Sequence, residues 1–178
     1  MYTTFDLPAD LDTPVGAFCK LESLRPRFLL ESVVGAEHAA RYSFLGFGDG
    51  LEVRLADGEL RVGDRRMRAP VLAADIRAAL RDALDAAPRP RTARGDDAPG
   101  LPFCGGLVGA CAFDLARRLA RLPNQAPGDR GTEAAFFAPR SVLVFDHATR
   151  RAALLHDGDA AEHAALRREV IEIGRAHV

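Results

Sequence analysis

Two short apolar runs, separated by a polar connection that contains a glycine, stand out early in the chain. They are Phe28–Val34 and Tyr42–Phe47. Each is rich in aromatic or aliphatic residues and short enough for a strand, so the pattern predicts two paired strands. Glu31 and Ser32 interrupt the first run. A carboxylate and a hydroxyl inside an otherwise apolar strand cost stability unless they find partners, so this stretch hints at a small polar ligand.

A regular alternation of apolar and polar residues follows. It runs through Leu51–Leu55 and resumes in Glu59–Val62. The dipeptide Asp57-Gly58 between them is a strong hairpin signal, and Gly63-Asp64 marks a second turn before a last short strand. We therefore expect an antiparallel meander from Arg27 to Arg68, with one face buried and the other polar.

Three stretches show helical periodicity. The first is Pro14–Ser23, where Thr13 offers a capping hydroxyl and proline occupies the first turn. The second is Asp75–Ala87, and the third is Asp159–Glu172. The apolar stripes expected to face the core are Val15, Phe18 and Leu21 in the first helix, Leu72, Ile76, Leu80, Ala83, Leu84 and Ala87 in the second, and Leu166 and Val170 in the third.

The later part of the chain mixes strands and a further helix. We interpret the glycine-rich apolar stretch Phe103–Asp114 as a buried strand that another backbone approaches closely. Asp114 is placed to cap a helix over Leu115–Leu122. Ser141–Phe145 is a strongly β-forming run that turns at residues 146–149 and returns through Arg151–His156.

Two polar stretches, Pro88–Gly100 and Asn124–Ala135, are expected to be solvated loops. The order of elements is then helix, meander, helix, strand, helix, hairpin and helix. This order predicts an α+β fold with mostly antiparallel, sandwich-like sheets and flanking helices.

Two motifs invite a chemical interpretation. Asp146 and His147 could form a catalytic pair, but adjacent strand residues point to opposite faces and no serine or cysteine nucleophile is placed beside them, so we interpret them as turn residues. The glycines of Gly105–Gly109 could suggest a phosphate loop. Their spacing matches neither phosphate-binding motif, and they precede the apolar strand, so close backbone packing is the better interpretation.

Composition narrows the functional class. The chain has 178 residues and a net charge of −1, with 24 basic residues interleaved with acids, so it lacks the basic stripe that nucleic acid requires. It has no signal peptide and no apolar run near the roughly 20 residues of a membrane span, so we expect a cytoplasmic protein. The odd number and wide spacing of Cys19, Cys104 and Cys111 favour buried thiols over disulfides or a zinc site.

Several stretches together carry a family resemblance. They are Thr13–Leu21; Phe28–Val33 with Arg41–Gly46; Gly105–Gly109 followed by Phe113-Asp114, Arg117 and Leu122-Pro123; and, more weakly, Phe145–His147. Their order and spacing resemble the N-terminal domain of anthranilate synthase component I, a chorismate-utilising enzyme, over roughly Phe5 to Glu172. The pair Leu-Leu-Glu-Ser and Arg-Tyr-Ser-Phe-Leu-Gly is its most specific part. One departure is Ala110-Cys111, where the family tends to have an aromatic residue after the glycine.

The resemblance implies half of the larger anthranilate synthase component I fold. Its activity is the conversion of chorismate and ammonia to anthranilate and pyruvate in tryptophan biosynthesis, with ammonia supplied from glutamine by amidotransferase component II. In this family the chorismate and Mg²⁺ sites lie in a C-terminal chorismate-binding domain that this chain would lack. The resemblance therefore implies a truncated chain that is inactive alone, holds no cofactor, and exposes apolar surface normally covered by the missing half.

The same resemblance implies a regulatory site. The Leu-Leu-Glu-Ser motif lines the family's feedback pocket for L-tryptophan, which nominates Leu30, Glu31 and Ser32. The chemistry fits, because Glu31 can accept hydrogen bonds from the ammonium of an amino acid and the Ser32 hydroxyl can donate or accept. Residue types alone favour a solvent-facing Glu31 and a locally bonded Ser32, whereas the motif favours the ligand interpretation. No catalytic or metal-binding residue is nominated.

Two other functions stay open. One is a fragment of aminodeoxychorismate synthase component I of folate synthesis, which shares the architecture, although the Leu-Leu-Glu-Ser and Thr-Pro-Val motifs favour the tryptophan branch. The other is a stand-alone regulatory module that binds an amino acid. Because Ile173–Val178 resembles a translated sequencing adapter, we expect a domain over residues 1–172 and a non-native tail over residues 173–178. A genuine helix end with Gly174 near the C-cap is the alternative.

Overall fold

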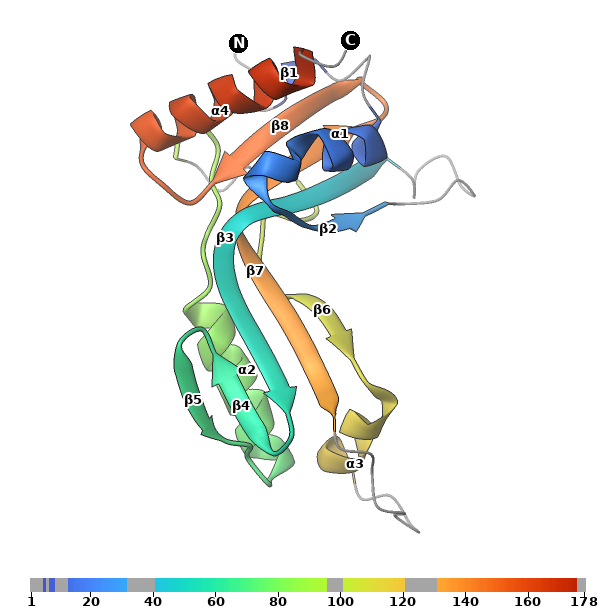
Figure 1. The fold of residues 1–178 in the computed structure, drawn as a ribbon, viewed down its shortest axis with the longest axis vertical. Helices are drawn as coiled ribbons and strands as arrows, with labels where there is room; N and C mark the ends of the chain where they lie inside the picture. The colour runs from blue at the N-terminus through green and yellow to red at the C-terminus, as the bar shows by residue number, and fades with distance from the viewer. Residues whose placement is uncertain are drawn as a thin grey trace. The chain divides into compact units, whose positions relative to one another are not determined.

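The computed structural model describes residues 5, 7–8, 13–31, 41–95, 101–120 and 131–175, without the side chains of Asp114 and Arg117 (Figure 1). The chain divides into two compact units. Unit 1 comprises Met1–Asp49, Pro88–Gly105 and Pro139–Val178, and unit 2 comprises Gly50–Ala87 and Gly106–Ala138. Two long strands, β3 (Tyr42–Ala56) and β7 (Thr132–Asp146), each contribute residues to both units.

The described strands are joined by hydrogen bonds into one sheet with the order β1-β8-β7-β3-β4-β5, with β2 beside β3 and β6 beside β7. The remaining strands are β1 (Leu7–Pro8), β2 (Pro26–Leu30), β4 (Glu59–Val62), β5 (Arg65–Arg68), β6 (Val108–Cys111) and β8 (Arg151–His156). Each pairing with a defined residue register is antiparallel. This architecture confirms the predicted α+β class with mostly antiparallel pairing.

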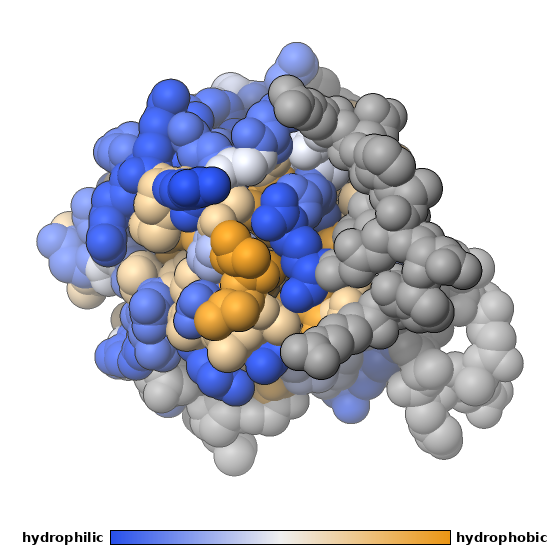
Figure 2. Space-filling view, turned by 90° about the horizontal axis from the view of Figure 1, so that it is seen from below, coloured by the Kyte–Doolittle hydropathy of each residue, from blue (hydrophilic) through white to orange (hydrophobic). Residues whose placement is uncertain are grey.

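On the face shown in Figure 2, hydrophilic residues surround hydrophobic ones that gather near the middle of the view. Among the described residues, the most exposed large hydrophobic side chains are Phe113 at 86%, Val71 at 75% and Leu72 at 64%. Within the same described part of the chain, no helix combines the length and the hydropathy needed to cross a membrane.

Unit 1 buries both faces of its part of the sheet. Leu143, Phe145 and Leu154 face one cluster, where the helices α1 (Pro14–Lys20) and α4 (Ala160–Arg175) pack (Figure 1). The alternate residues of β7 and β8 form a second cluster, made of Val142, Val144, Ala153 and Leu155. Since successive side chains of a strand point to opposite faces, burial of both faces explains why these strands are continuously apolar.

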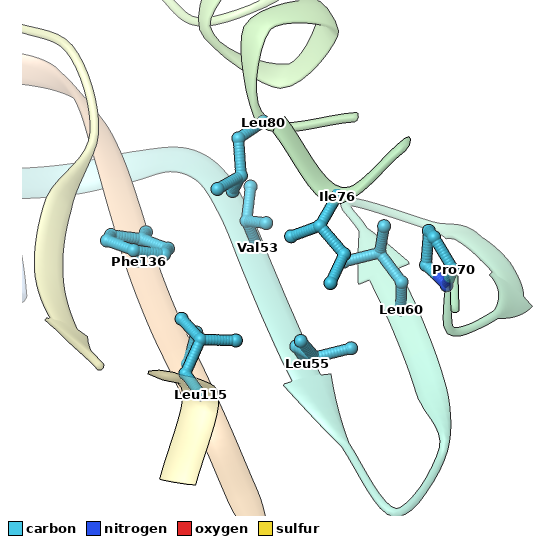
Figure 3. A pocket seen from close by; sticks show the side chains of 9 residues that line it. Val53, Leu55, Leu60, Pro70, Ile76, Leu80, Leu115 and Phe136 are labelled. Atoms are coloured by element: carbon cyan, nitrogen blue, oxygen red, sulfur yellow. The ribbon is translucent and has the colours of Figure 1, made fainter. Parts of the chain in front are cut away.

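Unit 2 is organised around the meander of β3, β4 and β5 and the helix α2 (Ala73–Asp85). Figure 3 shows Ile76 and Leu80 of this helix pointing toward Val53 and Leu60 of the strands. These side chains leave an apolar gap of about 10 Å³, which is at the lower limit for a single water molecule. The apolar stripe of α2 therefore covers the buried face of the meander.

The predicted hairpin turns are confirmed. Ala56 pairs with Glu59 across the Asp57-Gly58 turn, and both turn residues have positive φ, 51° and 78°. This left-handed pair matches the right-handed twist of the strands, and glycine adopts it without steric cost. The second turn, at Gly63-Asp64, joins β4 to β5 as expected.

The opening strand pair is confirmed, but its boundaries differ from the prediction. The strand β2 ends at Leu30 rather than Val34, and residues 32–40, which include Ser32, lie outside the described part. The runs Tyr42–Phe47 and Leu51–Leu55 are parts of the single strand β3. The strand passes through Gly48, at φ 79°, without ending.

The positions of the predicted helices are largely confirmed, but Val15, expected to face the core, is 51% exposed. Pro14–Ser23 is covered by α1 and the following 3₁₀ helix η1 (Leu21–Leu24), and the Thr13 hydroxyl accepts a hydrogen bond from the Gly16 amide at 3.0 Å. In α2 the stripe is narrower than expected, because Leu72 and Leu84 are exposed. The final helix continues to Arg175, and Ile173 packs against the unit 1 core, whereas residues 176–178 lie outside the described part.

The interpretation of Phe103–Asp114 as a buried strand is wrong. Only β6 is a strand there, and three of its four residues are exposed. Close backbone packing is nevertheless confirmed at Gly109, where a Cβ atom would lie 2.7 Å from the Cα of Phe136 and collide with the Ala135 carbonyl. The helix predicted over Leu115–Leu122 is reduced to the 3₁₀ helix η2 (Phe113–Leu115) and α3 (Ala116–Leu119), and residues 121–130 lie outside the described part.

Three further expectations need correction. Pro88–Gly100 is not wholly a solvated loop, because Pro90 is buried and Arg91 exchanges backbone hydrogen bonds with His156 at 3.0 and 2.9 Å. Residues 132–135, expected in a loop, belong to β7. The cysteines are not buried: Cys19 and Cys111 are exposed, and Cys104 is partly exposed.

Candidate functional site

The nominated residues lie where β2 ends. Leu30 is the last residue of the strand and pairs with Phe44 of β3. Its side chain is 41% exposed, and Glu31 immediately after it is also exposed. The structure thus presents an apolar and an acidic side chain side by side at one strand end, while Ser32 lies outside the described residues.

Aromatic rings line the face of unit 1 that Leu30 shares with its partner Phe44. The Phe44 ring lies edge-on to that of Phe103, with centroids 5.3 Å apart, and Phe28 meets Phe103 at 6.4 Å. The row continues from Phe44 to Tyr42 at 6.3 Å. Edge-to-face and offset pairs are the favoured aromatic geometries. Because directly opposed strand residues share a face, Leu30 continues this aromatic surface toward solvent.

Gly46 is required by this aromatic surface. It pairs with Phe28 across the two strands, and the Phe28 ring lies over it so closely that a Cβ atom at position 46 would collide with the ring. A glycine under an aromatic ring lets the ring lie flat on the sheet. The glycine that ends the Arg-Tyr-Ser-Phe-Leu-Gly motif therefore has a packing role beside the candidate site.

An ion pair fixes the start of β3. The Arg41 guanidinium donates from Nε to Asp146 Oδ1 at 3.0 Å and from Nη2 to Oδ2 at 2.8 Å. Asp146 is 1% exposed and also accepts a hydrogen bond from the Ala148 amide at 3.0 Å. The bonds from Arg41 hold the pKa of the Asp146 carboxyl below its ordinary value, against the opposing effect of burial. The carboxylate is therefore charged at neutral pH.

A second polar contact lies beside this ion pair. Ser43 Oγ and His147 Nε2 share a hydrogen bond of 2.8 Å, and the His147 amide donates to the Arg41 carbonyl at 2.9 Å. The expectation that no serine stands beside the Asp146-His147 pair is therefore wrong. Ser43 is only 1% exposed, however, and Asp146 is bound by Arg41. Interpretation as a turn that anchors β3 still describes these residues better than a nucleophilic site, because a substrate cannot reach the serine.

The geometry around the end of β2 suits the binding of a ligand rather than catalysis. Glu31 offers an exposed charged acceptor, Leu30 and the aromatic row offer an apolar surface, and the contacts of Arg41 and Ser43 fix the chain that follows residues 32–40. Among the described residues, no group of three or more His, Cys, Asp or Glu side chains is placed to hold a metal ion.

Sequence reasoning did not foresee the four residues that anchor the site. Arg41 and Asp146 are 105 positions apart, and Ser43 and His147 are 104 apart. No local periodicity can pair residues at such separations. One indication of their importance was present in the sequence, because both pairs fall in motifs that carry the family resemblance.

Comparison with known proteins finds relatives named anthranilate synthase component 1. No protein-family model matches the chain. Anthranilate synthase component 1 of Thermus thermophilus is 38% identical over 161 residues, which are 89% of this chain and 32% of that protein. The Acetivibrio thermocellus protein of the same name is 32% identical over 146 residues, 81% of this chain and 28% of the relative. That of Mycobacterium tuberculosis is 38% identical over 124 residues, 68% of this chain and 23% of the relative.

Among solved structures, the crystal structure of anthranilate synthase component I from Streptococcus pneumoniae aligns with 97% of this chain and 36% of its own, at a TM-score of 0.48 and 20% identity. The sequence relatives confirm the resemblance inferred from the motifs. The chain is therefore a homologue of anthranilate synthase component I, and it spans about a third of the length of the first two curated relatives.

Proposed function

We propose that this chain is the regulatory part of an anthranilate synthase component I. The complete enzyme would convert chorismate and ammonia to anthranilate and pyruvate for tryptophan synthesis. The similarity to the Thermus thermophilus protein over 89% of the chain carries this proposal. The names of the relatives favour the tryptophan branch over aminodeoxychorismate synthase.

In this proposal, the catalytic steps are performed by parts of the enzyme outside this chain. The chorismate and Mg²⁺ sites would belong to the C-terminal chorismate-binding domain, and a glutamine amidotransferase, component II, would supply ammonia. In this chain, Asp146 and His147 are engaged in the anchoring contacts with Arg41 and Ser43. We therefore expect the isolated chain to form no anthranilate from chorismate and ammonia.

The effector proposed for the end of β2 is L-tryptophan, bound by Leu30, Glu31 and Ser32. The exposed Glu31 carboxylate is accessible to an ammonium, which needs a charged acceptor. Half-exposed Leu30, which continues the row of Phe44 and Phe103, supports the proposal, because an indole ring gains from edge-to-face and apolar contact. Binding at this site would inhibit catalysis through a coupling free energy between two sites.

A chimera tests the proposal. The matching third of the Thermus thermophilus enzyme is replaced by this chain, and anthranilate is followed by its fluorescence with increasing L-tryptophan. We expect turnover that tryptophan inhibits. Ser32→Phe should relieve inhibition and spare turnover. Glu31→Gln should raise the half-inhibitory tryptophan concentration about tenfold or more, because a hydrogen bond to a charged group contributes about 1.5–3 kcal/mol.

The matched control is Glu22→Gln, which changes an exposed glutamate of η1. It should leave both turnover and inhibition unchanged. Inhibition that persists in both the Ser32 and Glu31 variants would remove these residues from the site. Tight calorimetric binding of L-tryptophan to the isolated chain would instead favour a stand-alone amino-acid sensor, since we expect residues outside this chain to complete the pocket.

A further inference from the structure

Unit 1 contains a second candidate site at the end of its helical layer. It is a pocket of about 220 Å³ between η1, β3, β7, β8 and α4. Its floor is apolar and consists of Leu24, Phe47 and Leu166, which belong to the helix-covered core. An apolar floor under a few placed polar groups is the usual composition of a small-molecule site.

The backbone at the rim of the pocket is held in an unusual conformation. Arg25 adopts a left-handed conformation with φ 56°, which costs energy for a side chain larger than glycine. Gly48 opposite also has a positive φ, and its amide donates to the Arg25 carbonyl at 3.0 Å. Such conformations persist where the surrounding structure fixes them, and they concentrate at binding sites. Here they place the Arg25 side chain on the rim.

The charges at the rim leave one guanidinium available to an anion. Arg25 is paired with Asp49 at 2.6 Å, and both side chains are largely exposed. Arg140 donates from Nε and Nη2 to the Asp157 carbonyl at 3.0 and 2.6 Å. These bonds fix its guanidinium without neutralising the charge, and the nearest described carboxylate, that of Glu162, lies 3.8 Å away and is half-exposed. An exposed pair at that distance contributes little.

A neutral polar pair completes the lining. Ser141 Oγ and His156 Nδ1 share a hydrogen bond of 3.0 Å in the pocket wall. Burial, and to a lesser extent the nearby Arg140 charge, lower the pKa of His156 below its ordinary value. The ring is therefore neutral at physiological pH, and the Ser141–His156 pair offers hydrogen bonds without adding a fixed charge of its own.

We propose that this pocket binds a small monocarboxylate with a compact apolar body. The carboxylate would accept hydrogen bonds from Arg140, and the body would lie on Leu24, Phe47 and Leu166. The volume corresponds to roughly seven water molecules, at about 30 Å³ each, which is the size of a single ring. The Arg140 guanidinium, which is 3.8 Å from the half-exposed Glu162 carboxylate, can pair with one ligand carboxylate, and the apolar floor distinguishes such a ligand from an inorganic anion.

Calorimetry of the full chain with benzoate tests the proposal. We expect saturable binding of benzoate, with the isosteric but uncharged benzamide and inorganic phosphate each at least about tenfold weaker, equivalent to about 1.4 kcal/mol. Arg140→Gln should weaken benzoate binding by a similar factor. Arg77→Gln, on the exposed side of α2, is the matched control and should change nothing. Equal binding of benzamide or of phosphate would overturn the proposal.

A second variant keeps the test independent of the structural bonds of Arg140. Ser23 lines the pocket and is exposed, so Ser23→Trp should fill the space without disturbing the core. Benzoate binding should then be lost while circular dichroism stays unchanged. Undiminished binding in a folded Ser23→Trp chain would contradict the location.

Titration of the His156 ring by NMR gives a direct readout. Benzoate beside it should raise its pKa, because an added negative charge favours the imidazolium. The other groups that face this ring are Arg140 from β7, Asp157 from the following turn, and Glu162 and His163 from α4. Ser23→Trp leaves all of them in place and should abolish the benzoate-dependent shift. Benzoate binding that leaves the His156 titration unmoved would overturn the assignment.

Discussion

At the scale of single residues, one buried carboxylate explains how the candidate regulatory stretch is positioned. Asp146 is hidden from solvent but receives two bonds from Arg41 and one from the Ala148 amide. A buried charge is tolerated when it is paired and hydrogen-bonded. The pair joins the first described residue after segment 32–40 to the turn after β7, so the chain that leaves the Leu30–Glu31 site returns to a fixed point.

This carboxylate makes a prediction about pH. Because the folded pKa of Asp146 lies below its ordinary value of 3.8, its stabilising effect is complete above about pH 4 and is lost as the pH falls toward the folded pKa. Asp146→Asn should lower the free energy of unfolding at neutral pH by about 1–3 kcal/mol. The variant should also lose less stability than the parent chain between about pH 5 and pH 3, measured by urea unfolding.

Asp82→Asn is the control, since Asp82 is an exposed residue on α2. It should reproduce the pH dependence of the parent chain. An Asp146→Asn chain whose stability falls with acid as steeply as that of the parent would show that other carboxylates dominate the acid response.

The residue scale also shows what sequence reasoning could reach. Glu31 was nominated by a motif and by its polarity in an apolar run, and its exposure agrees with a ligand contact without testing it. The contact between Ser43 and His147 could not be inferred, because both ends look like ordinary strand and turn residues and only the packing of β3 beside β7 brings them together. Contacts between side chains that are far apart in sequence depend on how the whole sheet is assembled.

At the scale of elements, local patterns succeeded where one face of an element is buried. Helix α2 and the β3–β4–β5 meander have a clear period, and both are confirmed. The length of strand β7 was underestimated, because apolar and polar residues alternate only weakly at its start and its later residues are buried on both faces. Around β6, in contrast, the sequence predicted a longer and more buried strand than the structure has. The glycines and small residues there mark close backbone approach rather than burial.

The start of α4 offers a test at this scale. Asp159 Oδ1 accepts hydrogen bonds from the amides of Ala161 and Glu162, each at 2.8 Å, and Glu162 Oε2 accepts from the Asp159 amide at 3.0 Å. This reciprocal capping box satisfies amides that the helix leaves unpaired. Asp159→Ala should therefore destabilise the chain by about 1 kcal/mol, measured by urea unfolding.

Asp82→Ala provides a control of opposite sign. It removes an aspartate from the exposed interior of α2, where alanine has the higher helix propensity, so stability should stay unchanged or rise slightly. Equal destabilisation by both substitutions would point to a general loss of charge and not to the cap.

At the scale of the whole molecule, the exposed apolar side chains bear on how the chain behaves alone. The chain spans about a third of the length of its first curated relatives, and Phe113, Val71 and Leu72 are among its most exposed large hydrophobic residues. Single exposed apolar residues are ordinary in folded proteins, but Val71 and Leu72 are adjacent in sequence and belong to the same unit as Phe113. They resemble surface that another part of a protein would cover.

We therefore expect the isolated chain to self-associate as its concentration rises, because association removes these side chains from water at about 25 cal/mol for each Å² buried. Phe113→Ser combined with Leu72→Ser should shift the association midpoint, measured by sedimentation equilibrium, to at least about tenfold higher concentration. Ala78→Ser, at an exposed position of α2, should leave the midpoint unchanged. Association that withstands the double substitution would have to use other surfaces of the chain, and a chain that stays monomeric at every accessible concentration would show that these side chains are simply solvated.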